Sequence, residues 1–394
     1  MALWDRLRAK LRWQQIGYLA TIAASVLFLW VGNRVAFQDM KVLDMVDASS
    51  EVVCAKVDRI WARDVRPYRI DSQVMEAVTI YFEATITSGP RSGSQVGAEQ
   101  INDPLMAVQL REVEAGDRIT MIRYQRSEEE QVWVLQEYDR SRPLMALGAV
   151  FLLLLLLFGG KKGFHTIVSL VFTCLGIFIV FIPLILAGYN IYIATLIICI
   201  FITGMTLSLV NGLNRKSLSA AVGCLGGLLV SGILVWVLTG ALKLTGFVEE
   251  ESAFLLYMNP DNPLDLKAII FSGILIGALG ATLDVAVSMA SALCEISATS
   301  RETSFRSMVR SGVNIGRDIM GTMTNTLILA YIGGSLTMSL LLIVYSNSLL
   351  ELINREMIVV EILQAVIGSI GLLCAIPLTC LFAAYIFTRQ KPQE

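Results

Sequence analysis

Small and polar residues recur along one long apolar segment, SGILIGALGATLDVAVSMASALCEI, which runs from Ser272 to Ile296. They follow one another at intervals of three or four residues, a spacing that places them on one face of a helix. The set is Gly273, Gly277, Gly280, Asp284, Ser288, Ser291 and Glu295. Because a charge in hydrocarbon costs a few kcal/mol or more, an acid such as Asp284 within a membrane span is by default a functional-site hypothesis. The alternative is a structural Asp that is hydrogen-bonded to a neighbouring helix.

A second polar set follows in the next apolar segment. It comprises Arg317, Asp318, Gly321, Thr322, Thr324, Asn325 and Thr326. About twenty polar residues, 297–316, join the two segments, and we expect the two helices to pack antiparallel. At about 1.5 Å per residue, Asp284 would lie level with about Ala330, and Glu295 level with Arg317 or Asp318.

These positions predict two kinds of role. Asp284 would take up and release a proton, since burial in apolar surroundings favours its neutral form, while the hydroxyl and amide groups would hold a water chain or a polar substrate path. Arg317 and Glu295 would form a gate pair at the inner mouth. Gly273, Gly277, Gly280 and Gly321 would serve helix packing, and Gly333 and Gly334 would serve packing or a helix break. Alternatively, the polar groups only join helices, and Asp318 only complements a helix dipole.

The composition places the chain in a membrane. Of its 394 residues, 55% are hydrophobic and 16% are charged, with a mean hydropathy of +0.66, whereas a soluble domain carries about 25% charged residues. The net charge of −2 and the local clustering of basic residues predict no nucleic-acid partner. With one histidine and no paired cysteine spacing, we expect no metal site and no cofactor. Nucleophile elbows and phosphate loops are absent from the sequence, so we predict that the protein is not an enzyme.

Apolar stretches of spanning length predict about eight transmembrane helices. They are Ile16–Val35, Pro143–Phe158, Thr166–Leu186, Ile191–Val210, Leu218–Leu244, Ala268–Ile296, Ile319–Tyr345 and Ile358–Phe387. Lys and Arg cluster in alternate connections, so the positive-inside rule places both termini in the cytoplasm and residues 40–141 outside.

The outer region reads as a small β domain. Segments rich in Val, Ile and Thr predict strands at Glu51–Ile60, Glu76–Thr87, Arg118–Tyr124 and Gln131–Tyr138, with turns at Ser88–Gly97 and Glu114–Asp117. Four or five short strands suggest a small barrel of the OB or SH3 type. The expected fold is a membrane all-α helical bundle with an extracytoplasmic β-barrel-like domain between the first and second spans. Its parts are residues 1–39, 40–141 and 142–394.

Several motifs resemble the YibE/F-like family of multi-pass bacterial membrane proteins. They are EYDRSRPL (Glu137–Leu144), GGKKG (Gly159–Gly163), GALGATLDVAVSMASALCEI (Gly277–Ile296), SGVNIGRDIMGTMTNTLILAYIGGSL (Ser311–Leu336), INREMIVVEIL (Ile353–Leu363) and IPLT (Ile376–Thr379). The resemblance implies a multi-pass protein of the bacterial cytoplasmic membrane and supplies no substrate. More distantly, the Asp284 and Arg317 spans are similar to the core of SecD/SecF and other RND permeases, in which an intramembrane carboxylate carries protons.

Together these features favour a proton-coupled secondary transporter or export-associated permease that uses Asp284. The predicted partners are the lipid bilayer, an unknown small-molecule or ion substrate, and a second copy in a homodimer. The alternative is a non-transporting accessory or assembly subunit whose outer domain recruits partners and whose Asp284 is structural.

Overall fold

The computed structural model of the protein describes residues 2–38, 51–70, 73–105, 110–125, 131–248, 251–257, 263–299, 304–346 and 348–388. The chain divides into two compact units. One comprises Met1–Leu43 and Leu155–Glu394, and the other comprises Asp44–Leu154.

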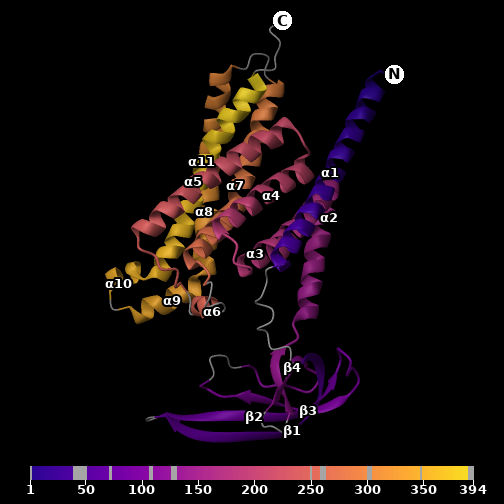
Figure 1. The fold of residues 1–394 in the computed structure, drawn as a ribbon, viewed down its shortest axis with the longest axis vertical. Helices are drawn as coiled ribbons and strands as arrows, with labels where there is room; N and C mark the ends of the chain where they lie inside the picture. Colours follow the sequence, from indigo (N-terminus) through magenta and orange to yellow (C-terminus); the bar gives the residue numbers. More distant parts are fainter. Residues whose placement is uncertain are drawn as a thin grey trace. The chain divides into compact units, whose positions relative to one another are not determined.

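Helices make up most of the larger unit, and strands lie only in the smaller one (Figure 1). The helical elements are α1 Ala2–Gln38, α2 Ser141–Leu175, the π-helical turn Gly176–Phe181, α3 Ile182–Leu186, α4 Ile191–Asn211, α5 Arg215–Ala241, α6 Glu251–Tyr257, α7 Leu266–Thr299, α8 Phe305–Gly334, α9 Leu336–Tyr345, α10 Leu349–Asn354 and α11 Glu356–Thr388. The strands are β1 Val52–Ile70, β2 Gln73–Ile86, β3 Gln95–Asn102, β4 Arg118–Gln125 and β5 Gln131–Tyr138.

The described residues include 6 helices that are long and apolar enough to cross a membrane, or up to 7 if the bent pair α8–α9 is one span. Eight were predicted. The difference arises partly because the predicted second and third stretches lie in one helical run, Ser141–Leu186. That run is not a straight rod. Gly160 has φ 52° and ψ −127°, and a Cβ on Gly163 would collide with the carbonyl of Leu155. In a straight helix these two residues would be about 12 Å apart, so the run bends sharply at the Gly159–Gly160 pair. The number of membrane crossings stays a prediction.

The start of α8 corrects another expectation. The segment 297–316 was predicted as a polar connection, but α7 continues to Thr299 and α8 already begins at Phe305. Ser304 caps α8 by accepting a hydrogen bond from the Ser307 backbone N–H, which satisfies one of the free donors at a helix start. Helices can extend beyond the apolar layer with polar residues, and hydropathy alone does not detect this. At the other end, packing or a helix break was predicted for Gly333 and Gly334, and the structure has the break: α8 and α9 meet at 63°.

The predicted small sheet domain is present, with differences in its strands. β1 is longer than expected, and β3 was not predicted. The strands pair in the order β1-β2-β3-β5-β4, and β4 pairs with β1. The seam between β3 and β5 consists of only two parallel residue pairs, Ala98–Trp133 and Glu99–Val134. Whether the domain is of the OB or SH3 type stays a prediction.

A buried glutamine supports the short seam of the sheet domain. Gln100 on β3 donates to the Arg111 carbonyl at 2.7 Å and accepts from the Val113 N–H at 2.8 Å. Its side chain therefore holds the 110–113 segment beside β3, where the sheet offers few backbone partners. Beneath it lies an apolar core that includes Ile80, Phe82 and Met121.

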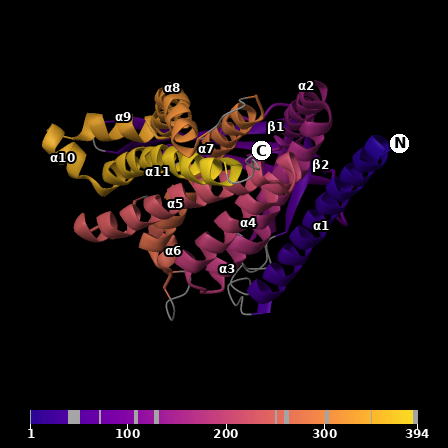
Figure 2. The same cartoon turned by 90° about the horizontal axis from the view of Figure 1, so that it is seen from above.

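In the helical unit, α11 packs against α5, α7 and α8 (Figure 2). The α5–α11 crossing is formed by small residues. A Cβ on Gly227 would collide with the Gly371 carbonyl, and a Cβ on Gly371 would collide with the Ser231 hydroxyl. Ser231 also donates to the Ile367 carbonyl at 3.2 Å. Small side chains let helix backbones approach closely, which is how apolar helices gain contact where water supplies no driving force.

Candidate functional site

Between residues 273 and 295, helix α7 exposes mainly the predicted polar face. Between residues 273 and 295, the exposed positions are Gly273, Gly277, Gly280, Asp284, Ser288 and Glu295. Ser291 is half-buried and donates to the Val287 carbonyl of its own helix at 2.6 Å. All other side chains in this stretch are buried or half-buried against neighbouring helices. In the stretch 273–295, α7 therefore exposes polar residues and glycines, and it packs its apolar side chains against neighbouring helices.

Helix α8 presents a second polar face. Its exposed polar residues include Arg317, Asp318, Thr322, Asn325 and Thr326, while Thr324 is half-buried. The hydroxyls of Thr322 and Thr326 donate to the carbonyls of Ile319 and Thr322, each at 2.9 Å. These two groups are thus bonded within their helix but can still accept a bond from water. On its opposite side α8 packs against α11 through Gly312, Gly316 and Leu327.

Two contacts fix how α7 and α8 lie against each other. A Cβ on Gly277 would be 2.6 Å from the Tyr331 hydroxyl, and a Cβ on Gly312 would be 3.2 Å from Leu293. The helices are therefore antiparallel, as predicted, but their register differs from the prediction. Interpolation between the two contacts places Asp284 level with 321–324, about two turns from the predicted Ala330. The early start of α8 explains the shift.

This register separates the predicted gate pair. Arg317 lies level with 288–291, and Glu295 lies level with 310–313 instead of with Arg317. Among the residues that the structure describes, no ion pair or hydrogen bond joins Glu295 to Arg317, and both side chains are exposed. In this structure the two side chains are therefore not paired, and their role as a gate stays a prediction.

Asp284 has no hydrogen-bond or ion-pair partner within the described part of the chain. Its carboxylate interacts electrostatically with the buried Cys224 thiol of α5. Across from Asp284, Thr324 lies on the same side of α8 as Tyr331, because seven residues make two turns. The Thr324 and Tyr331 hydroxyls are both buried and lack a hydrogen-bond partner in the described residues. Two uncommitted hydroxyls thus lie along the α7–α8 contact, one of them at the level of Asp284.

Tyr331 was not among the predicted site residues. Its hydroxyl lies against Gly277 and interacts electrostatically with Glu361 of α11. The spacing of two turns after Thr324 was the available signal, but a tyrosine in an apolar segment is usual near membrane interfaces. With Gln364 of α11 4.0 Å from a Cβ on Gly273, polar groups continue along α7 from Glu295 to Gly273.

Not all of the glycines that were predicted to serve helix packing lie against a neighbouring helix. A Cβ on Gly280 or Gly321 would meet nothing within 4 Å, and one on Gly273 would only reach Gln364. Within a single chain, the packing role predicted for Gly280 and Gly321 is wrong, because both lie on the uncovered faces of their helices. Only Gly277 is in close contact, with Tyr331. The close helix crossings lie instead at Gly227, Gly371, Gly312 and Gly316.

No group of three or more His, Cys, Asp or Glu that could hold a metal ion occurs among the described residues.

Comparison with known proteins identifies one family. The family model described as YibE/F-like protein matches residues 147–389, which is more than half of the chain and includes all of α7 and α8. No curated protein and no solved structure matches the chain. The more distant resemblance to SecD/SecF is not shown by these comparisons.

Proposed function

The chain belongs to the YibE/F-like family, and we propose that it is a proton-coupled secondary transporter or export-associated permease that uses Asp284. Its apolar helices fit a multi-pass membrane protein. One observation carries the proposal: Asp284 has no hydrogen-bond or ion-pair partner among the described residues, and it lies on the exposed face of the stretch 273–295 of α7, whose other side chains are buried or half-buried. A structural Asp would be hydrogen-bonded to the neighbouring helix, and Asp284 has no such bond in the part of the chain that the structure describes.

Energetics supports a hydrated face. An ionised carboxylate in hydrocarbon costs several kcal/mol or more, so the face carrying Asp284 must meet water or protein when the acid is charged. Protonation removes most of this cost. A carboxyl group that is hydrated in one conformation and desolvated in another therefore couples proton uptake to the change between the two conformations. A proton-driven carrier requires this coupling.

The neighbouring groups provide a route for the proton. Thr324 and Tyr331 offer uncommitted hydroxyls on the α8 side, and Ser288 lies one turn along α7 toward Arg317. Hydroxyls both donate and accept, so they can hold a chain of waters that leads to a carboxylate. The substrate would follow the same polar face, as a small polar molecule or an ion.

The test is proton flux in liposomes that contain purified protein, an internal pH-sensitive dye and an imposed potential. We expect flux with the wild-type protein, none with Asp284→Asn, and residual flux with Asp284→Glu, because Glu keeps a titratable carboxyl. Tyr331→Phe should lower the flux about tenfold, the effect of one lost hydrogen bond, without loss of folded protein, since the hydroxyl has no hydrogen-bond partner among the described residues. Asp64→Asn, an exposed carboxyl-to-amide change in the sheet domain, is the matched control and should behave as wild type.

Two results would contradict the proposal. Equal flux through wild type and Asp284→Asn would mean that the acid is not the proton carrier. Absence of flux in every variant would favour the accessory or assembly subunit if Asp284→Asn also complements a deletion strain as well as the wild type does. In that subunit the acid only needs to form hydrogen bonds, which Asn can also form.

A further inference from the structure

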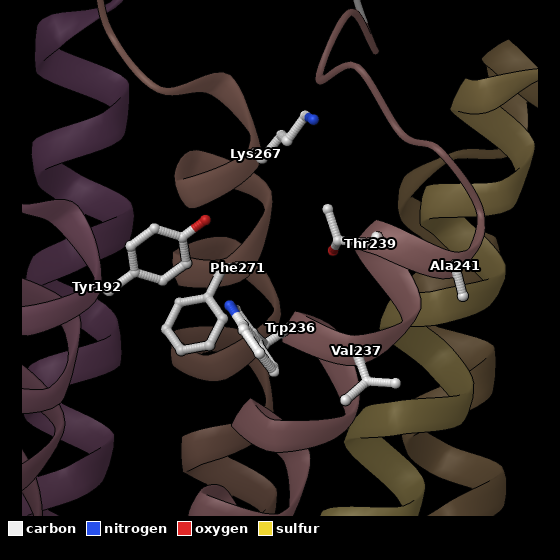
Figure 3. A pocket seen from close by; sticks show the side chains of 8 residues that line it. Tyr192, Trp236, Val237, Thr239, Ala241, Lys267 and Phe271 are labelled. Atoms are coloured by element: carbon white, nitrogen blue, oxygen red, sulfur yellow. The ribbon is translucent and has the colours of Figure 1, made fainter.

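A second feature of the helical unit lies away from Asp284. At the end of the bundle where α4 and α7 begin and α5 ends, a cavity of about 450 Å³ opens between the three helices. Figure 3 shows the rings of Tyr192, Phe271 and Trp236 gathered below Lys267, with Thr239 across the opening. Phe271 is roughly 140° around α7 from Asp284, so this cavity belongs to a different side of the helix.

The cavity continues into an apolar groove. A space of about 400 Å³ runs between α4 and α5 and shares Tyr192, Trp236 and Phe271 with the first cavity. Apart from these three aromatic residues, it is lined by Leu196, Leu228, Leu229, Gly232 and Ile233. Gly232 keeps the groove open, because a larger side chain there would extend toward Phe271. One end of the combined space is polar and the other is hydrocarbon-like.

The polar end carries a lysine and an unpartnered hydroxyl, with one carboxylate close by. Lys267 is exposed and forms no ion pair within the described residues. The nearby Asp265 carboxylate is already engaged, since it accepts from the Lys267 and Ala268 backbone N–H groups at 3.0 and 3.2 Å and interacts with the Tyr192 hydroxyl. The Thr239 hydroxyl oxygen is buried and has no hydrogen-bond partner in the described part of the chain.

We propose that this space is a binding site for an anionic phospholipid. The phosphate of the headgroup would accept hydrogen bonds from the Lys267 ammonium and the Thr239 hydroxyl, and an acyl chain would lie in the groove along Leu229 and Ile233. Trp236, which is 68% exposed, lies between the two compartments, where an amphipathic ring fits the level of the headgroups. Basic pockets between transmembrane helices bind lipid headgroups by the same chemistry. Under the predicted orientation this lipid belongs to the outer leaflet.

The experiment uses Trp236 as the reporter. Purified protein in detergent is titrated with phosphatidylglycerol brominated in its acyl chains, which quenches nearby tryptophan emission, and in parallel with brominated phosphatidylcholine. We expect saturable quenching by phosphatidylglycerol at concentrations about tenfold lower than by phosphatidylcholine. Trp236→Phe identifies the part of the signal that comes from this site.

Variants separate the two compartments. Lys267→Gln and Thr239→Val should each weaken phosphatidylglycerol binding, the former about tenfold, as expected for loss of a hydrogen bond to a charged group. They should leave phosphatidylcholine nearly unchanged. Gly232→Leu should weaken both lipids because it fills the groove. Lys243→Gln is the matched control: this lysine lies just beyond α5 at the same end but does not line the cavity.

A different source of the phosphate is tested with glycerol phosphate, which has the headgroup but no chain. If it displaces brominated phosphatidylglycerol at similar concentrations, the site takes a soluble phosphate and the lipid proposal is wrong. Equal quenching by both lipids in the wild type, or equal effects of Lys267→Gln and Lys243→Gln, would also overturn it. Circular dichroism of each variant establishes that the fold is retained.

Discussion

At the scale of single residues, the distinction that matters is between polar groups whose hydrogen bonds are made and those whose bonds are not. Ser291, Thr322 and Thr326 bond to carbonyls of their own helices, so their presence in a span costs little. Asp284, Thr324 and Tyr331 have no such partner in the described residues. Unmade hydrogen bonds in an apolar setting are costly, so these three groups are the ones on which the proposed proton path depends.

In the sheet domain, a hydrogen bond to a carboxylate makes the stability depend on pH. The Tyr68 hydroxyl, which donates to Asp103 at 2.6 Å, and then the Leu105 N–H lower the pKa of the Asp103 carboxyl. Since the folded pKa is lowered, this contact stabilises the domain above the unfolded pKa of about 3.9. The stabilisation is lost as the pH falls through the lower, folded value.

We therefore expect the sheet domain to lose stability between pH 5 and pH 2 (roughly, from the unfolded pKa and its depression), and Tyr68→Phe to make that loss shallower. Urea unfolding of the intact protein, followed by the emission of Trp61 and Trp133, measures it. A steeper acid dependence in Tyr68→Phe would show that the hydroxyl does not hold the Asp103 pKa down. Arg66→Gln, whose guanidinium pairs with Asp64 on the surface, is a control for general charge effects.

At the scale of helices, close contacts between backbones decide which elements are fixed. Helix α11 is held to α5 through Gly227 and Gly371 and to α8 through Gly312 and Gly316. Helix α8 therefore rests mainly on α11, and its contact with α7 is made by fewer residues, among them Tyr331 against Gly277. The polar groups of the candidate site lie along this thinner contact, where a change in helix separation disturbs the least packing.

A glycine substitution tests the α5–α11 crossing. Gly227→Ala places a Cβ against the Gly371 carbonyl, which is backbone and cannot rotate away, and we expect it to destabilise the folded protein by about 1–3 kcal/mol. Gly204→Ala in α4 is the matched control, since its Cβ would meet nothing within 4 Å, and it should be neutral or slightly stabilising because alanine favours helix. Melting temperatures in detergent compare the two. Equal melting temperatures would mean that the crossing adjusts without cost.

At the scale of the whole molecule, the uncovered polar faces of α7 and α8 must meet water or another protein surface. We propose a second copy of the chain. The exposed face carries both acids, such as Asp284 and Asp318, and bases, such as Arg310 and Arg317, so two copies related by a two-fold axis can pair opposite charges. Gly280 and Gly321, which pack against nothing in one chain, would then allow close approach between copies.

Disulfide cross-linking in membranes checks this dimer. In a background that has alanine in place of the seven cysteines and retains proton flux, Ser288→Cys on the polar face should cross-link to a second copy. Ile200→Cys, which is 56% exposed on α4, is the matched control and should not. Equal cross-linking at both positions, or none at Ser288→Cys, would contradict a two-fold contact through the α7–α8 face.

The sequence by itself determined that the chain has apolar helices of membrane-spanning length and a sheet domain. It also determined which residues form the polar face of α7. Periods of two and 3.6 residues are local properties, so strands such as Gln131–Tyr138 and the face from Gly273 to Glu295 follow from spacing alone. The tertiary structure decided the register. A helix can begin before its apolar part, as α8 does at Phe305, and this shift moved Asp284 from the predicted level of Ala330 to that of Thr322 and Thr324. It also separated Glu295 from Arg317 and brought Tyr331 to the site, because the side chains that meet across two helices depend on their relative displacement, which neither sequence segment contains.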